Sequence, residues 1–301
     1  MNMATPWPTL SRLLDVPAPA KLNLFLHVTG QRADGYHLLQ SVFMLIDWCD
    51  RLHFELRPDG QISREDLAGM PLPAEDLCIR AARALKQATG CELGVHIGLE
   101  KHLPAEAGLG GGSSDAATCL LALNRLWGLG LSRGALCAIA LPLGADVPFF
   151  VGGRTAWVEG IGDQLTPVTL DPARFVVVKP AGGASTQRIF TSPDLKRDTG
   201  TAIIRGFAAN ESVEPGALDL QKILEFGHND LQPVAQALCP EVGLCIDWLQ
   251  SQGLTGRMTG SGTAVFAPVL NTPDFSGAQG NWTVQMCSNL NVHPLFDWCP
   301  D

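Results

Sequence analysis

Four of the five residues from Gly108 to Gly112 are glycine, and they stand directly before an amphipathic helical pattern. Glycines let successive backbone N–H groups converge on an anion without obstruction by a Cβ atom, and a helix start adds roughly half a positive charge. The stretch therefore predicts a phosphate-binding loop at the start of a helix from about Ser114 to Trp127. A flexible linker capped by serine is the alternative, but it leaves four glycines between a strand and a strong helix unexplained.

The loop matches neither of two common nucleotide motifs. No Gly-Lys-Ser/Thr follows at the spacing of a Walker A loop, and Ser113 stands where the dinucleotide fingerprint needs its last glycine. A different kind of phosphate loop is therefore expected.

The composition excludes several classes of protein. With 301 residues, 46% of them apolar, the chain is long enough for two domains with cores, which argues against disorder. A formal charge of -9 offers no broad basic surface for nucleic acid, and the nine cysteines include no C-x-x-C pair that would indicate zinc. The apolar stretches, such as residues 175–178, are too short to span a bilayer, and no secretory leader is evident. We expect a cytoplasmic monomer or homodimer without a membrane or nucleic-acid partner.

The N-terminal part has the pattern of a β-hairpin. Over residues 19–28 apolar and polar side chains alternate, which places Lys21 and Asn23 on one face of a strand. Turn residues over 30–35 and an apolar run over 38–46 complete the hairpin. Two residues are expected at its mouth, Tyr36 and His37.

Helices and strands are mixed along the rest of the chain. This mixture predicts two α+β domains, residues 1–168 and 169–301, with a boundary in the turn-rich segment 167–172. A loop is expected over residues 143–153. The predicted helices cover residues 76–89, 132–142, 217–226 and 240–252, and the predicted strands cover residues 93–99, 175–179 and 263–269.

Two charged residues gain meaning beside the glycine loop. Asp146 lies among apolar residues between Gly144 and Pro148, where a turn or capping aspartate is the ordinary interpretation. Lys21 alone would be an edge-strand lysine on a solvated face. The pair becomes informative only together with the glycine loop.

Six segments resemble the motifs of known kinases. Four of them are similar in content and order to the GHMP kinases: Pro19 to Leu24, Gly108 to Ala117, Gly144 to Phe150 and Gly256 to Gly262. Two more are similar to the 4-diphosphocytidyl-2-C-methyl-D-erythritol kinases within that superfamily: Asp34 to Phe43 and His228 to Leu231. The resemblance covers about residues 17–269. Any one motif is weak evidence, whereas six in the right order are specific.

The resemblance implies a first domain like domain 2 of ribosomal protein S5, a ferredoxin-like second domain, and an active site between them. It implies ATP and Mg²⁺, and a diphosphocytidyl methylerythritol as the small-molecule substrate. The implied reaction phosphorylates the 2-hydroxyl of that alcohol, in the non-mevalonate route to isoprenoid precursors.

The resemblance also implies roles for individual residues. Asp146 is expected to accept the proton of the acceptor hydroxyl, while Lys21 keeps that carboxylate ionised and offsets charge on the transferring group. Ser113 or Ser114 is expected to meet magnesium or the phosphates. The expected ATP-binding residues are Pro104, Ala105, Glu106, Ala107, Gly108, Leu109, Gly110, Gly111, Gly112, Ser113 and Ser114.

The expected binding site for the acceptor lies at the hairpin mouth. By resemblance, Tyr36 and Phe190 sandwich the cytosine ring, since a base stacks well on an aromatic platform. His37 and Thr186 offer polar contacts. The expected substrate-binding residues are Asn23, Tyr36, His37, Phe43, Asp146, Thr186 and Phe190.

Several positions leave questions open. Glu106 stands where related loops carry a small residue, and Asp76 stands where many relatives have an asparagine that touches adenine. The segment 260–262 either closes over the phosphate loop or forms a plain tight turn. Asn229 and Asp230 match the family pattern without an assigned role.

Three other functions compete with this interpretation. A GHMP kinase for another alcohol, such as homoserine or mevalonate, is disfavoured by residues 34–37. A nucleotide-binding regulator without catalysis is disfavoured because Lys21 and Asp146 are both present. An RNA-binding module is disfavoured by the acidic balance.

Overall fold

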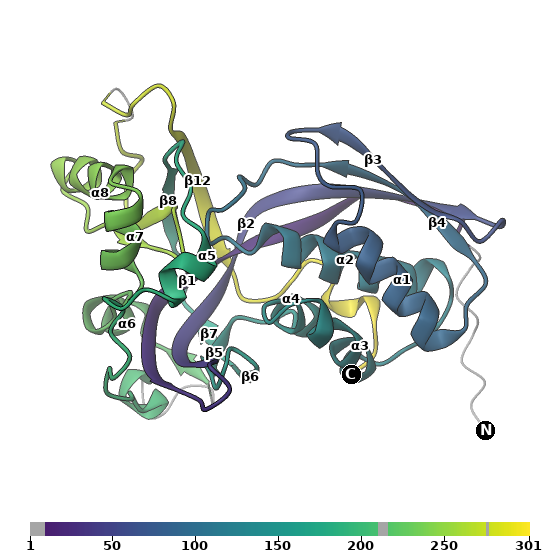
Figure 1. Cartoon of the computed structure of the whole chain (residues 1–301), viewed down its shortest axis with the longest axis horizontal. Helices are drawn as coiled ribbons and strands as arrows, with labels where there is room; N and C mark the ends of the chain where they lie inside the picture. The colour runs from purple at the N-terminus through teal and green to yellow at the C-terminus, as the bar shows by residue number, and fades with distance from the viewer. Residues whose placement is uncertain (1–9, 210–215, 275–276) are drawn as a thin grey trace.

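A long hairpin joins the two lobes of the molecule. The computed structural model describes residues 10–209, 216–274 and 277–301. Strands β1 (Arg12–Gln31) and β2 (His37–Arg57) run antiparallel through both lobes (Figure 1). The hairpin was predicted, but its strands have 20 and 21 residues and extend well beyond the alternating pattern. Residues 18–28 are all buried, so both faces of this part of β1 are covered by protein.

One sheet extends from the first lobe into the second. The other strands of the described residues are β3 (Ile62–Ala68), β4 (Gly94–Glu100), β5 (Ala156–Glu159), β6 (Gln164–Pro167), β7 (Thr169–Leu170), β8 (Arg174–Lys179), β9 (Ala217–Leu218), β10 (Arg257–Met258), β11 (Val265–Val269) and β12 (Thr283–Leu290). Within the described part of the chain, ten of the strands form one sheet with the path β10-β11-β8-β12-β2-β4-β3, to which β1, β5 and β6 are added. β12 connects the lobes because Leu290 and Asn289 pair with Leu45 and Ile46 of β2.

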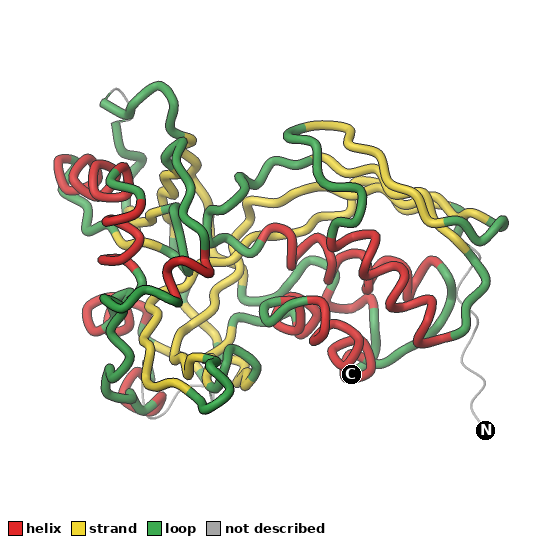
Figure 2. The backbone as a smooth tube through the Cα atoms, viewed as in Figure 1, coloured by secondary structure: helices red, strands yellow, loops and turns green. Residues whose placement is uncertain are grey.

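Helices of the first lobe lie along one face of its strands (Figure 2). They are α1 (Leu77–Thr89), α2 (Gly111–Leu126), α3 (Arg133–Ala140) and α4 (Val147–Gly152), with a 3₁₀ turn over 141–143. α1 agrees with the prediction because Asp76 accepts a hydrogen bond from the Ile79 amide at 3.0 Å, and Gly90 ends the helix in the left-handed conformation.

Two helices of the first lobe differ from the prediction. α2 begins at Gly111, three residues before the predicted start, because Gly110 precedes it in the left-handed conformation. The loop predicted over 143–153 was wrong, since α4 occupies most of it. Pro148 suits the first turn of a helix and Gly153 ends it with a positive φ, so both signals were present in the sequence.

The second lobe contains α5 (Thr186–Phe190), α6 (Leu220–Phe226), α7 (Gln232–Leu238) and α8 (Glu241–Ser251), with a 3₁₀ turn over 204–207. α8 matches the predicted helix closely. The helix predicted over 217–226 was too long, because residues 217–218 form β9 and Asp219 then caps α6 through the Lys222 amide at 3.1 Å. The sequence interpretation did not predict α5, α7 or β12.

The C-terminal tail returns to the first lobe, as Figure 1 shows. A 3₁₀ turn over 296–298 lies there, and Leu295 and Cys299 are buried in the core built by α1, α2 and β4. Arg133 of α3 donates to the Phe296 carbonyl at 2.6 Å. The limits 1–168 and 169–301 stay a prediction, but the second segment contributes side chains to the core of the first.

Candidate active site

A cavity of about 1320 Å³ lies between the lobes. It is lined by the glycine stretch, the hairpin, the start of α4, α5 and the turn over 260–262. Every predicted site residue lines it except Ser114. The chain folds so that segments more than 200 residues apart in the sequence meet around one space.

The glycine loop needs glycine for two local reasons. Gly108 and Gly110 both have φ of +73°, a conformation that residues with a Cβ atom rarely adopt. A Cβ at Gly108 would also lie 2.1 Å from the Thr259 carbonyl oxygen. At Gly110 it would lie 2.9 Å from the ring of Phe150. The loop is therefore packed against other elements, which excludes the flexible-linker interpretation.

The turn over 260–262 contacts the glycine loop directly. Next to it, the Thr263 amide donates to the Glu106 carbonyl at 2.9 Å and the Ala264 amide donates to the Ala107 carbonyl at 3.2 Å. Asn229 holds the turn from behind, because its Nδ2 donates to the carbonyls of Met258 and Gly260 at 2.9 and 2.8 Å. The structure thus gives Asn229 a positioning role that the sequence could not assign.

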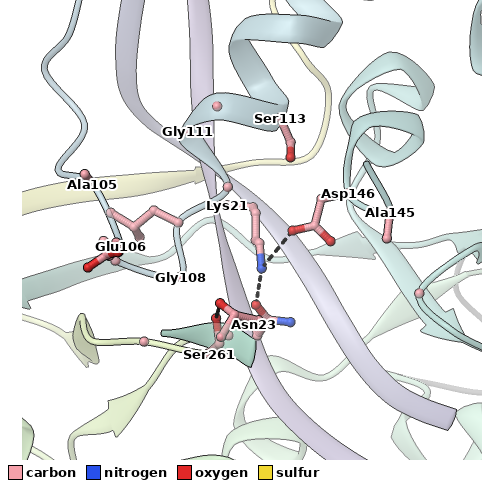
Figure 3. Close-up of a pocket in the computed structure, with 18 of the residues that line it drawn as sticks. Lys21, Asn23, Ala105, Glu106, Gly108, Gly111, Ser113, Ala145, Asp146 and Ser261 are labelled. Atoms are coloured by element: carbon pink, nitrogen blue, oxygen red, sulfur yellow. Dashed lines mark hydrogen bonds and ion pairs between the residues drawn. The ribbon is translucent and has the colours of Figure 1, made fainter. Parts of the chain in front are cut away.

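Lys21 lies at the centre of the cavity (Figure 3). Its Nζ is 3.6 Å from Oδ2 of Asp146 and donates to Oδ1 of Asn23. Asn23 is fixed in turn, since its backbone N–H donates to the hydroxyl of Thr259 at 2.8 Å and its Nδ2 donates to the hydroxyl of Ser41 at 3.1 Å. The predicted pair of lysine and aspartate is brought together by β1 and the start of α4.

Burial affects the pKa of Lys21. The residue is 4% exposed, and this burial lowers the pKa of its ammonium group below the ordinary value. The charge of Asp146 opposes the shift without cancelling it. The interpretation of Lys21 as a solvated edge-strand lysine was therefore wrong, because both faces of β1 are covered at this point. A buried cation surrounded by a few polar atoms interacts strongly with an anion placed beside it.

The two serines at the start of α2 differ in their surroundings. The Ser113 side chain lines the cavity and extends toward Lys21 and Asp146 in Figure 3. Ser114 is fully buried, and its hydroxyl donates to the Pro19 carbonyl at 2.7 Å. Ser114 therefore connects α2 to β1, whereas Ser113 is the serine that faces the cavity.

The two departures from the family pattern also have structural explanations. The Glu106 carboxylate is directed to the opposite lobe, where a Cβ at Gly183 would come within 2.2 Å of its Oε2. Figure 3 shows it turned away from Lys21. Asp76 lines the cavity, but one of its oxygens caps α1 and the other lies 3.6 Å from Nε of Arg64.

Aromatic and polar side chains collect at the hairpin end of the cavity. Tyr36 is 61% exposed, and the rings of His37 and Phe190 lie 5.0 Å apart. The Thr186 hydroxyl is 2.7 Å from that of Ser261. Sequence reasoning missed Arg197, whose Nε donates to Nε2 of His37 at 3.0 Å, because it lies in a loop with no motif.

Sequence reasoning also missed a buried ion cluster beside the glycine loop. Lys101 contacts Oδ2 of Asp115 at 2.7 Å and also contacts Asp50, and both carboxyl groups are almost completely buried. Burial raises the pKa of Asp115 to about 8, although Lys101 acts in the opposite direction. Lys101 lies three residues before Pro104, so its closeness to the predicted loop was the available signal.

The family comparisons agree on both halves of the chain. Residues 76–154 match the family model described as GHMP kinases N terminal domain, and residues 214–282 match that described as GHMP kinases C terminal. A protein of Polaromonas naphthalenivorans (strain CJ2) named 4-diphosphocytidyl-2-C-methyl-D-erythritol kinase is 63% identical over 295 residues, which cover 96% of this chain and 97% of the relative. A protein with the same name from Delftia acidovorans (strain DSM 14801 / SPH-1) is 63% identical over 293 residues, covering 96% and 98%.

Solved structures share the fold. A crystal structure of 4-(cytidine 5'-diphospho)-2C-methyl-D-erythritol kinase is 32% identical, with a TM-score of 0.72 over 92% of this chain and 98% of the other. A homoserine kinase from Cytophaga hutchinsonii has a TM-score of 0.68 over 97% and 98%, but at 16% identity it supports the fold alone. The predicted α+β two-domain GHMP kinase fold is confirmed. Among the described residues, no helix is both long and apolar enough to cross a membrane.

Proposed function

Because the chain belongs to the 4-diphosphocytidyl-2-C-methyl-D-erythritol kinases of the GHMP kinase family, we propose that Lys21 and Asp146 form its phosphoryl-transfer centre. The enzyme transfers a phosphoryl group from ATP to the 2-hydroxyl of that alcohol, and the competing interpretations as a kinase for another alcohol, a regulator or an RNA-binding module no longer hold. The observation that carries the assignment is the position of Lys21, between Asp146 and Asn23 in the cavity that the glycine loop lines.

We assign the phosphates of ATP to the loop over 104–113 and the start of α2. The first N–H groups of a helix have no partner within the helix and favour an anion in front of them. Gly110 adopts the left-handed conformation that turns the chain into this helix. An ATP tail placed here has its terminal phosphate on the side of the cavity where Ser113 and Lys21 lie.

The reaction requires an oxygen nucleophile in line with the γ-phosphorus. The oxygen of the 2-hydroxyl forms a bond to phosphorus while the bond to the oxygen bridging the β- and γ-phosphates breaks, and ADP leaves. Asp146 orients the hydroxyl and takes its proton as the new bond forms. Lys21 stabilises the negative charge on the transferring group, and its burial makes this interaction strong.

Magnesium fits the polar groups around the phosphates. This cation commonly takes one or two protein oxygens together with phosphate oxygens and water. The Ser113 hydroxyl lines the cavity and is an oxygen donor of the required kind. When bound, the ion would neutralise charge on the β- and γ-phosphates.

We assign the cytidine part of the acceptor to the hairpin end of the cavity. Tyr36 from the hairpin turn and Phe190 from α5 are aromatic side chains, and both line the space there. A flat base between them would gain stacking on both faces. Asn23 and Phe43 line the path from this end to Lys21, and the Phe43 ring lies 4.7 Å from its Nζ.

Substitution of Asp146 by asparagine tests the assignment. Asp146→Asn keeps the size of the side chain but removes the proton acceptor, so kcat should fall by about 10² to 10⁴ while ATP affinity changes little. Formation of the 2-phosphate product can be followed by mass spectrometry. Asp171→Asn, at an exposed acid in the loop between β7 and β8, is the matched control and should keep wild-type turnover. Wild-type kcat in Asp146→Asn would refute the role of Asp146.

A further inference from the structure

Arg197 is held rigidly at the hairpin end of the cavity. Its guanidinium group donates to three backbone carbonyls, those of Leu195 at 2.9 Å, Ser192 at 2.8 Å and Phe190 at 3.1 Å. Its Nε–H points to Nε2 of His37 at 3.0 Å. Four hydrogen bonds fix the plane of the guanidinium group, so its Nε–H bond has one direction.

This contact determines where His37 carries its proton. A guanidinium group stays protonated and has only N–H donors. Nε2 of His37 must therefore accept the hydrogen bond, and a neutral imidazole that accepts at Nε2 carries its hydrogen on Nδ1. His37 lines the cavity, and no hydrogen-bond partner of its Nδ1 is found among the residues that the structure describes.

We propose that Arg197 is a positioning residue that fixes His37 as the Nδ1–H tautomer and thereby gives this end of the cavity a hydrogen-bond donor for the cytosine ring. The inference rests on the proposed cytidine site. Cytosine presents two acceptors, O2 and N3, on the edge that a donor can reach. Without Arg197 the imidazole is free to carry its hydrogen on Nε2. Nδ1 of His37 would then be an acceptor facing O2 or N3 of cytosine, which are also acceptors.

The contact also opposes protonation of His37. Burial and then the charge of Arg197 lower the pKa of the His37 imidazole below its ordinary value. Other charged groups on the surrounding elements are Arg32 and Asp34, which pair with each other at 2.7 Å on the hairpin turn, Arg188 on α5, and Asp194, Lys196 and Asp198 in the loop. A protonated His37 would turn an N–H toward the N–H of Arg197, so this contact disfavours protonation of the wild-type ring.

Kinetics of Arg197→Met test the inference. We expect the KM for the cytidine substrate to rise roughly tenfold, the cost of losing one hydrogen bond to the ligand, with kcat and the KM for ATP little changed. In a His37→Ala background the same substitution should have no further effect on KM. An equal loss in both backgrounds would mean that Arg197 only supports the loop, and would overturn the proposal.

The dependence of KM on pH should differ between Arg197→Met and the wild type. In Arg197→Met the KM for the cytidine substrate should fall as the pH is lowered from about 8 to about 6, because an imidazolium carries N–H on both nitrogens and regains the donor. In the wild type the KM should change less over that range, because Nδ1 already carries a hydrogen and the contact with Arg197 disfavours protonation. Parallel profiles in the two proteins would refute the tautomer argument.

Nitrogen NMR of the wild-type protein labelled with ¹⁵N-histidine tests the first step without any substitution in Arg197. His37 is assigned by the signal lost in His37→Ala, and its shifts should report hydrogen on Nδ1. Hydrogen on Nε2 in an enzyme that turns over the cytidine substrate would overturn the inference and leave the function intact. Hydrogen on Nδ1 in an enzyme that binds ATP but does not turn over that substrate would instead refute the proposed function.

Discussion

Replacing Gly108 by alanine should separate the glycine loop from the turn that packs against it. The φ of +73° costs a residue with a Cβ atom about 1 to 2 kcal/mol. The new Cβ would lie 2.1 Å from the Thr259 carbonyl oxygen, so the two segments must move apart by about 1 Å to reach an ordinary contact. That movement weakens the hydrogen bonds of Thr263 to Glu106 and of Ala264 to Ala107, each worth about 1 kcal/mol. We expect a total loss of about 3 to 4 kcal/mol in the free energy of unfolding.

The Gly128→Ala variant isolates the backbone contribution. Gly128 has φ of +66° and no atom within 4 Å of the position of a Cβ, so only about 1 to 2 kcal/mol should be lost. Urea unfolding measures the difference between the variants, and ATP titration should show weaker binding in Gly108→Ala alone. Equal stability of the two variants together with unchanged ATP affinity would refute the close packing of the loop on Thr259.

Two further predictions concern the acceptor site and the response to acid. Tyr36→Ala should raise the KM for the cytidine substrate by roughly 5- to 150-fold and leave the KM for ATP almost unchanged, while Tyr36→Phe should keep most of the stacking. Tyr36 is 61% exposed, so its substitution should change the melting temperature little. A large drop in the melting temperature of Tyr36→Ala would instead identify a packing residue. The free energy of unfolding should decrease as the pH falls from about 6.5 toward 4. Burial lowers the pKa of His27 to about 4 and that of His293 to about 3. In this pH range the unfolded chain therefore takes up protons that the native chain does not. His293→Asn should make this decrease shallower, and an unchanged pH profile in that variant would contradict the assignment to His293.

The sequence predicted the elements whose signals are local. Asp76 and Gly90 mark the two ends of α1, and the glycines from 108 to 112 mark the start of α2. The fold and the reaction were predicted from six motifs taken together, since no single motif distinguishes a phosphate loop from a linker. The residue sets proposed for ATP and the acceptor remain predictions, although all but Ser114 line one cavity.

Features that depend on distant contacts were not predictable in the same way. Lys21 has the pattern of a half-exposed strand, but Phe43, Gly110 and Asp146 lie against its side chain. α4 was missed because its six residues are too few for a helical period, which left only the weaker signals at its ends. Arg197 acts on His37 across 160 positions of sequence, and no local pattern reports such a contact.

The pairing of β12 with β2 and the return of the C-terminal tail determine when this chain can finish folding. Residues 1–168 emerge from the ribosome long before residues 289–299 are synthesised. Until then Leu45 and Ile46 form an open strand edge, and the first core lacks Leu295 and Cys299. Open edges favour association with other chains. A nascent chain that stalls before Asn289 is therefore expected to depend on chaperones, although its glycine loop, Lys21 and Asp146 have all been synthesised.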